Sequence, residues 1–456
     1  MVKLCSWSLF AVLAALLAVL EGSRHAPSCS DASAPEDLEH KYDVISAAVL
    51  WSNRLVWGSS TAGATMHQAI GSPVASPAQL DAVVTDEAVR LVAAGCGGAV
   101  AQRPEGGGAA LPALRVFDAG SGWGGTSFAL ARGLAQLSPS PSPSPSSSPS
   151  PSSSSSSPSS PMPPPRFVVS VDGVTLSALQ RDTAQALAAE QGLGDRVRFH
   201  KRSFDDVAEV AAAAAAAAAV ASGNVSSGGG AGGFDLAVAV EALVHSRDAR
   251  RTLRAITASL RPTSAGCHAS HLIITDDVLV APPASSPPTA GGGAGGDYYS
   301  VGGDDTALLG TYKKHWAGWS GSSFPLTEPQ WREALLAVGG GAAVAEPQPP
   351  GAAAAAAAAA VGNSSDGTGG ARSTRFLDLG AVHGLRLHDA ARLRVVAAIL
   401  CAAHSAVGAL RHLGLHLESL ESYLGTYRGA IARERLLVGG RLRYALITMT
   451  KTHVET

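Results

Sequence analysis

Short apolar runs alternate with segments of helical spacing through the middle of the chain. Five runs have the length and composition of buried strands: Leu114–Asp118, Phe167–Val171, Val197–Lys201, Phe234–Val240 and His271–Thr275. The segments between them favour helices: Thr126–Leu137, Ser177–Gly192, Ala208–Ala221 and Ala249–Leu260. This alternation predicts a mostly parallel sheet covered by helices on both faces.

Four tracts built largely from Ala, Gly, Ser and Pro separate these elements. They are Ser138–Pro165, Ala211–Gly233, Ala281–Gly296 and Gly339–Gly370. Such sequence carries too little varied apolar surface to offset the entropy of ordering it. The 456 residues therefore predict one large α/β domain with an appended cap, not several domains. The Ser/Pro tract joins the first helix to the second strand, a connection that lies away from the ligand in a doubly wound sheet.

The N-terminus combines a basic residue with an apolar run. Lys3 precedes Leu9–Leu20, which has the ~7–15 residues of a signal-peptide core and falls short of the ~20 that span a bilayer. Residues 1–26 are predicted to be a signal peptide or signal anchor. The expected location is the secretory pathway or a membrane anchor, with the plastid as the alternative. Membrane association, if it occurs, would run through this segment.

Charge and cysteine spacing exclude two classes of function. The net charge is −2, with 34 basic and 36 acidic residues and no basic block, which argues against a nucleic-acid partner. None of the five cysteines forms a C-x-x-C pair. No metal site and no disulfide framework are expected, and the cysteines are interpreted as ordinary buried thiols.

A glycine-rich turn follows the first predicted strand. Val116–Gly125 reads VFDAGSGWGG, and a strand that runs through glycines into a helix suits close approach of a ligand to the backbone. The spacing also satisfies the dinucleotide pattern G-x-G-x-x-G. Asp118 before the glycines favours S-adenosylmethionine over NAD, because a carboxylate there can orient an amino-acid-like ligand. The second strand has no acidic residue at its tip for a nicotinamide ribose, and Asp172 is the nearest candidate.

Several blocks together resemble a known family. DAGSGWGG, GVTLSALQ, GLGDRVRFHKRSFDD and FDLAVAVEALVHSRD occur in this order and are similar to the seven-strand (class I) S-adenosylmethionine-dependent methyltransferases. The subgroup they resemble contains sterol and tocopherol C-methyltransferases and cyclopropane fatty-acid synthases. The resemblance implies a doubly wound, mostly parallel seven-stranded Rossmann-like sheet at 111–280. It also implies an N-terminal helical lid at 36–110 and a substrate cap with the last strands at 297–456.

By that resemblance, residues at three strand ends would hold the cofactor. Asp118, Gly120, Gly122 and Gly124 would line its methionine end, Thr175, Leu176 and Gln180 its ribose, and Asp205 its adenine. Each has a plainer interpretation. Asp118 could be a helix N-cap, Trp123 a core residue, and Asp205 with Asp206 a solvated turn.

Glu241 and His245 follow the fourth strand and would face the reacting centre. They are the candidate catalytic residues, with a role in moving a proton of the acceptor, and the alternative is a surface pair on one helical turn. In the lid, Tyr42 would reach over the cofactor and Trp57 would line an apolar substrate pocket. Packing of an amphipathic helix is the alternative for both.

Beyond the fifth strand, Tyr312–Trp316 and Thr327–Val338 match the variable region that shapes a substrate pocket in this family, and Leu442–Ile447 reads as a last, antiparallel strand. The sequence thus predicts an S-adenosylmethionine-dependent methyltransferase that transfers a methyl group to carbon or nitrogen of a small-molecule or lipid-like acceptor. The alternatives are an NAD-dependent oxidoreductase and a non-catalytic binding protein of the same fold. The oligomeric state does not follow from the sequence.

Overall fold

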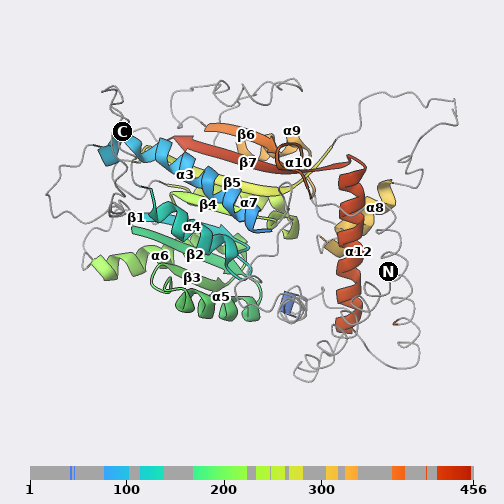
Figure 1. Ribbon diagram of the computed structural model, residues 1–456, viewed down its shortest axis with the longest axis horizontal. Coiled ribbons are helices and arrows are strands. Elements are labelled where there is room, and N and C mark those ends of the chain that lie inside the picture. Colours follow the sequence, from blue (N-terminus) through green and yellow to red (C-terminus); the bar gives the residue numbers. More distant parts are fainter. Residues whose placement is uncertain are drawn as a thin grey trace, which may run out of the picture.

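One seven-stranded sheet in the order β3-β2-β1-β4-β5-β7-β6 organises the computed structural model of the chain (Figure 1). The structure describes residues 42, 43, 46, 77–101, 113–137, 168–222, 233–246, 248–261, 267–280, 305–316, 324–336, 372–385, 407 and 418–452. The strands are β1 (Ala113–Ala119), β2 (Val168–Thr175), β3 (Val197–Lys201), β4 (Leu236–Val240), β5 (Ala269–Leu279), β6 (Arg372–Asp378) and β7 (Leu442–Thr452).

Strand direction confirms the predicted fold class. β1 to β5 pair in parallel, and β7 is antiparallel to both of its neighbours, β5 and β6. This is the mostly parallel, Rossmann-like sheet expected of the seven-strand methyltransferases. All five strands predicted in the core are present, as is the antiparallel last strand. β6 was not predicted, because it is a half-exposed edge strand that directly follows a low-complexity tract.

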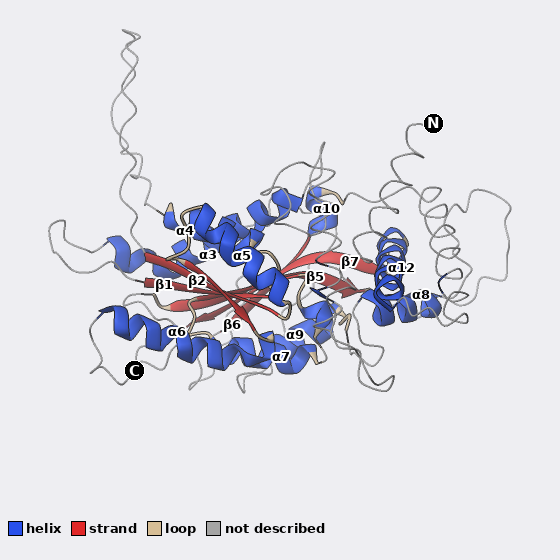
Figure 2. Cartoon of the chain, turned by 90° about the horizontal axis from the view of Figure 1, so that it is seen from below, coloured by secondary structure: helices blue, strands red, loops and turns tan. Residues whose placement is uncertain are grey.

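Helices cover both faces of the sheet (Figure 2). On one face lie α3 (Pro77–Ala101), α4 (Gly125–Ala135) and α5 (Ala178–Glu190), and on the other lie α6 (Val207–Ser222), α7 (Ala249–Ser259) and α9 (Glu328–Leu336). Burial on two sides explains why β4 consists of five buried apolar residues with no polar alternation. The Ala run predicted to be helical is α6.

The remaining elements gather beyond the strands' carboxyl ends and along the β6 side. α8 (Asp305–Thr311) and the π-helix η4 (Tyr312–Trp316) pack against α12 (Glu418–Val438), which lies across one end of the sheet in both views (Figures 1 and 2). α10 (Leu379–His383) follows β6. The short helices η2 (Phe204–Asp206) and η3 (Leu243–His245) follow β3 and β4.

The strand order predicts a ligand crevice at one edge of the sheet. From β1 the chain winds outward to β2 and β3, and it then returns to β4 on the other side of β1. Ligands of doubly wound sheets bind outside the carboxyl ends of the strands at such a reversal. The Ser/Pro tract connects the end of α4 to the start of β2, so its attachment points lie at the opposite edge.

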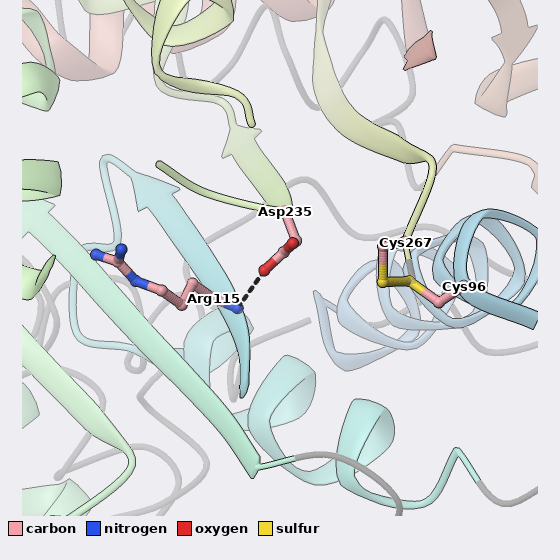
Figure 3. The surroundings of a disulfide bond; sticks show 4 residues. All are labelled: Cys96, Arg115, Asp235 and Cys267. Carbon is pink, nitrogen blue, oxygen red and sulfur yellow. Dashed lines mark hydrogen bonds between the residues drawn. A yellow bond between two sulfur atoms is a disulfide. The ribbon is translucent and has the colours of Figure 1, made fainter. Parts of the chain in front are cut away.

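A disulfide corrects the interpretation of the cysteines. Cys96 on α3 is bonded to Cys267, which precedes β5, with Cα atoms 4.1 Å apart (Figure 3). The expectation of ordinary thiols is wrong for this pair, because α3 packs across the sheet and brings together residues 171 positions apart. Nearby at the amino ends of the strands, the Arg115 amide donates a hydrogen bond to Asp235 Oδ2 at 2.9 Å (Figure 3).

Some predictions concern residues that the structure does not describe. The signal peptide or anchor at 1–26, Trp57 and the other three cysteines lie outside the described residues. Within the described part of the chain, no helix is long and apolar enough to cross a membrane.

Candidate functional site

The glycine turn between β1 and α4 lies in the crevice. Gly120, Gly122 and Gly124 all have positive φ, at 76°, 53° and 89°. The turn is fastened to the end of β2, because the Ser121 amide donates to the Val174 carbonyl at 2.8 Å. A Cβ at Gly120 would lie 2.6 Å from the Cβ of Ala242, whereas a Cβ at Gly122 would meet no atom within 4 Å. Gly120 therefore permits close packing below the turn, and Gly122 marks its open side.

Asp118 lies buried beneath this turn. Its carboxylate accepts a hydrogen bond from the Ser127 hydroxyl in the first turn of α4 at 2.5 Å. The N-cap interpretation is wrong, because Gly124 occupies the N-cap position without a side-chain cap. Asp118 thus joins the strand end to the helix start and shapes the turn, and its contact with a ligand stays a prediction. Trp123 is 2% exposed and is therefore a core residue, which was its plainer interpretation.

The predicted ribose residues at the end of β2 form a chain of hydrogen bonds. The Thr175 hydroxyl donates to Gln180 Oε1 at 2.5 Å. Gln180 in turn donates through Nε2 to the Ser46 hydroxyl at 2.7 Å. Leu176, between them in sequence, is half-buried at the start of the connection to α5. The β2 end is thereby joined to the N-terminal segment.

That segment spans the crevice. Asp43 accepts hydrogen bonds from the Ser177 hydroxyl and, at 3.4 Å, from the Leu179 amide, both after β2. Tyr42, beside it in sequence, places its ring edge-on against His245 after β4, with centroids 5.3 Å apart. β1 lies between β2 and β4, so residues 42, 43 and 46 together make contacts on both sides of the end of β1, where the glycine turn lies. This placement suits the lid that the resemblance implied.

Asp172 does not lie where a nicotinamide ribose would need it. The residue is three positions before the end of β2 and pairs in the sheet with Phe117 and Arg198. Its buried carboxylate contacts His200 Nε2 at 3.0 Å. The carboxylate on which the NAD alternative depended is therefore held in a contact between strands.

Asp205 follows β3 on the rim of the crevice. The residue is exposed, and its amide donates to the Ser203 hydroxyl at 3.1 Å. Its carboxylate accepts a hydrogen bond from Thr252 on α7, whose hydroxyl also contacts Ser246 at 2.8 Å. Asp205 thus lies in a partly solvated turn, as in its plainer interpretation. Its contact with Thr252 also fixes its side chain between the ends of two strands.

Glu241 and His245 are brought to the same strand end, but not as a surface pair. Glu241 is not helical, since η3 begins at Leu243. Its φ is 50°, and its carboxylate accepts a hydrogen bond from Arg433 Nη2 on α12 at 2.8 Å. The alternative of an exposed pair on one helical turn is wrong, because the Glu241 side chain is 11% exposed and is paired with Arg433.

A buried polar cluster surrounds this contact. Arg433 also binds Asp277 on β5 through two hydrogen bonds of 2.6 and 2.9 Å. The Tyr312 hydroxyl donates to the same carboxylate at 2.9 Å. The neighbouring Asp276 accepts from the Val244 amide of η3 at 3.1 Å. Sequence reasoning placed Tyr312 in the variable pocket region but missed Arg433, Asp276 and Asp277, for which the acidic pair at the end of an apolar strand was the local signal.

Burial perturbs the protonation of the cluster. Burial, followed by the charge of Asp277, raises the pKa of Asp276 well above its usual range. Burial also raises the pKa of Tyr312, as does Asp277. For Arg433, burial alone would lower the pKa, but Asp277 and Glu241 outweigh it and the pKa is raised. Arg433 stays charged, and Asp276 holds its proton to higher pH than an exposed aspartate.

The described residues contain no group of three or more His, Cys, Asp or Glu side chains placed to hold a metal ion. The polar groups at this edge of the sheet come instead from the glycine turn and from residues at the ends of β2, β3 and β4. Such a set suits an organic ligand with polar groups along its length.

Comparisons with known proteins give likenesses only at the level of structure. No family model matches the chain, and no curated protein matches it. Among solved structures, the [4+2]-cyclase SpnF has a TM-score of 0.43 and 14% identity, over 94% of this chain and 100% of that one. A Galdieria sulphuraria protein assigned as a sarcosine dimethylglycine methyltransferase has a TM-score of 0.43 and 13% identity, over 88% and 96%.

A third similar structure is the geranyl diphosphate C-methyltransferase from Streptomyces coelicolor A3(2), in complex with Mg²⁺, geranyl diphosphate and S-adenosyl-L-homocysteine. Its TM-score is 0.38 at 11% identity, over 94% of this chain and 100% of that one. At these scores and identities the likenesses concern the fold alone.

Proposed function

We propose that this protein is an S-adenosylmethionine-dependent methyltransferase that acts on carbon or nitrogen of a small-molecule or lipid-like acceptor. The observation that carries the proposal is the open glycine turn at the end of β1, with residues 42, 43 and 46 in contact with residues on both sides of it. An open backbone at Gly122 admits a ligand, and the segment above it, fastened at the ends of β2 and β4, would cover that ligand.

The chain's own residues fit this cofactor. The turn from Gly120 to Gly124 would take the methionine end, because the first amides of α4 favour polar and anionic groups. Thr175, Leu176 and Gln180 would lie along the ribose, and Asp205 would accept a hydrogen bond from the adenine amine. S-adenosylmethionine would supply a methyl group made electrophilic by its positively charged sulfur.

The acceptor would bind beyond the end of β4. Glu241 and His245 come from this strand end, and Tyr42 closes over it against His245. His245 would hold or move a proton of the acceptor, and Glu241 would orient it. Exclusion of water by the covering segment and fixed placement of the acceptor would supply most of the rate enhancement. Trp57 is proposed as a further wall of the pocket.

Two alternatives are separated by measurements of binding and of turnover. An NAD-dependent oxidoreductase would need a carboxylate for the ribose, and the candidate that the sequence offered for it, Asp172, is engaged with His200. A non-catalytic binding protein would bind the cofactor without turnover. Thermal unfolding of the full chain with S-adenosylmethionine, S-adenosylhomocysteine and NAD, each in turn, distinguishes the oxidoreductase from the other two functions. A ligand at 100 times its Kd adds about 2.7 kcal/mol to stability.

We expect both sulfur compounds, and not NAD, to raise the unfolding temperature. A rise with NAD alone would reject the methyltransferase proposal. A second step tests turnover with S-adenosylmethionine carrying a labelled methyl group and a panel of acceptors. The panel contains sterols, prenylquinols, phospholipid head groups and fatty acids, together with geranyl diphosphate and sarcosine, which are named with the similar structures.

A further inference from the structure

Arg433 is a buried arginine that joins the last long helix to two strand ends. The residue is 5% exposed, and its guanidinium is 5.4 Å from the ring centroid of Trp316 and 5.3 Å from that of Tyr444. The same group hydrogen-bonds both Asp277 on β5 and Glu241 after β4. Aromatic rings on its faces and carboxylates at its edge leave the guanidinium few orientations.

Glu241, one of its two partners, has an unusual backbone. Among the described residues it is the one non-glycine residue with positive φ. Its amide donates to the Thr275 carbonyl at 2.8 Å, so both its main chain and its side chain are fixed. A left-handed conformation in a residue with a side chain is unfavourable by itself and persists where the surroundings hold it. Arg433 is a charged partner of this side chain.

The same cluster also reaches the turn that carries His245. Asp276, adjacent to Asp277, accepts a hydrogen bond from the Val244 amide in η3. Its other oxygen accepts from the Asp277 amide at 2.9 Å. Both residues proposed for the acceptor side are therefore linked to the Arg433–Asp277 pair. Glu241 is bonded directly to Arg433, and the turn that carries His245 is bonded to Asp276, the neighbour of Asp277.

We propose that Arg433 is a positioning residue for the acceptor side, which holds Glu241 and the end of β4 in the arrangement needed for methyl transfer. This inference rests on the proposed function. Contact between α12 and the sheet would not by itself require charge, since well-packed apolar side chains often replace a buried ion pair without loss of stability. What an apolar contact cannot do is fix the direction of the Glu241 carboxylate.

The test uses the full chain with Arg433→Met, Arg433→Lys and the control Arg435→Met. Arg435 lies on the same helix but is exposed. Hydrogen exchange of the backbone over residues 241–246 reports the arrangement without any acceptor. We expect exchange there to be about tenfold faster or more in Arg433→Met, intermediate in Arg433→Lys and unchanged in Arg435→Met, because loss of the partner permits local opening.

Binding and turnover complete the test. S-adenosylhomocysteine affinity should stay within about twofold in all variants, since the contacts of Arg433 given above are with Asp277, Glu241 and two aromatic rings, and none of these is a proposed cofactor residue. With an acceptor from the panel, kcat should fall at least tenfold in Arg433→Met and recover in part in Arg433→Lys. If Arg433→Met does not fold, Arg433→Lys and Glu241→Gln weaken the same contact and decide the comparison.

Unchanged exchange over residues 241–246 in the folded Arg433 variants, or unchanged kcat, would overturn the inference. Failure of the proposed function has a different signature. In that case the wild-type chain does not bind S-adenosylhomocysteine, while the exchange comparison still shows whether Arg433 holds Glu241.

Discussion

The ring of Tyr42 stands edge-on to the imidazole of His245, with centroids 5.3 Å apart and planes at 86°. The contact joins residues 203 positions apart and fastens the N-terminal segment to the turn after β4. Two further contacts hold this N-terminal segment to the residues after β2. Ser46 accepts a hydrogen bond from Gln180, and Asp43 accepts one from the Leu179 amide. The segment is therefore held on both sides of the glycine turn.

Tyr42→Ala should weaken binding of S-adenosylhomocysteine by about 2- to 10-fold, because an edge-to-face pair contributes ~0.5–1.5 kcal/mol beyond its buried area. Tyr42→Phe keeps the ring and should bind within about twofold of wild type. Burial raises the pKa of Tyr42, so its hydroxyl stays neutral and should add no pH dependence near neutrality. Calorimetric titration of the wild type and of both variants measures the affinity for S-adenosylhomocysteine. Equal loss in both variants would assign the effect to the hydroxyl.

His245→Ala should lower turnover by ~10²–10⁴-fold if the imidazole moves a proton of the acceptor. Cofactor affinity should fall no further than in Tyr42→Ala, because the same ring contact is lost. His245→Phe is the matched control, because it preserves a ring against Tyr42 but cannot carry a proton. Steady-state rates with an accepted substrate show whether His245 moves a proton or only packs against Tyr42. Wild-type activity in the Phe variant would mean that His245 serves only packing.

Gly122→Ala should lower cofactor affinity at least tenfold, because the new methyl group would project from the open side of the turn. Gly192→Ala is a close control: Gly192 also has positive φ, at 67°, and no atom lies within 4 Å of a Cβ placed there. Both changes should reduce stability by a similar ~1 kcal/mol. If thermal unfolding and titration show equal cofactor affinity for the two variants, the turn is not the binding site.

Removal of the Cys96–Cys267 disulfide by a double Cys→Ser change should reduce stability by ~2–4 kcal/mol. Cofactor affinity should be unchanged, because the bond lies near the amino end of β5, away from the glycine turn. Denaturant unfolding with and without reductant gives the measurement. A reductant should destabilise the wild type and leave the double variant unaffected. Equal sensitivity of both would show that the pair is not bonded in solution.

Deletion of Ser138–Ser160 should leave cofactor affinity within about twofold of wild type. The tract joins the end of α4 to the start of β2 at the edge of the sheet opposite the crevice, and shortening a surface loop changes its closure free energy only slightly. Titration of the folded deletion variant with S-adenosylhomocysteine checks this. A large loss of affinity would contradict the placement of the tract away from the ligand.

The sequence by itself determined the features that depend on neighbouring residues. Buried parallel strands need continuous apolar runs, which is why the apolar pattern alone locates β1 to β5. The turn after Asp118 needs positive φ at three glycines, and this requirement is visible in the local sequence. Thr175, Asp205 and Glu241 were assigned to strand ends through the resemblance of their sequence blocks to the seven-strand methyltransferases, and each block is likewise a run of neighbouring residues.

Only the tertiary structure decided which distant residues meet. Arg433 contacts Glu241 across 192 positions, and Cys96 bonds Cys267 because α3 packs across the sheet. Asp172, a ribose candidate by its position in the sequence, is paired with His200 of the neighbouring strand. Such partners are chosen by strand order, helix packing and burial, and these arise from the whole fold. No local pattern of apolar and polar positions encodes them.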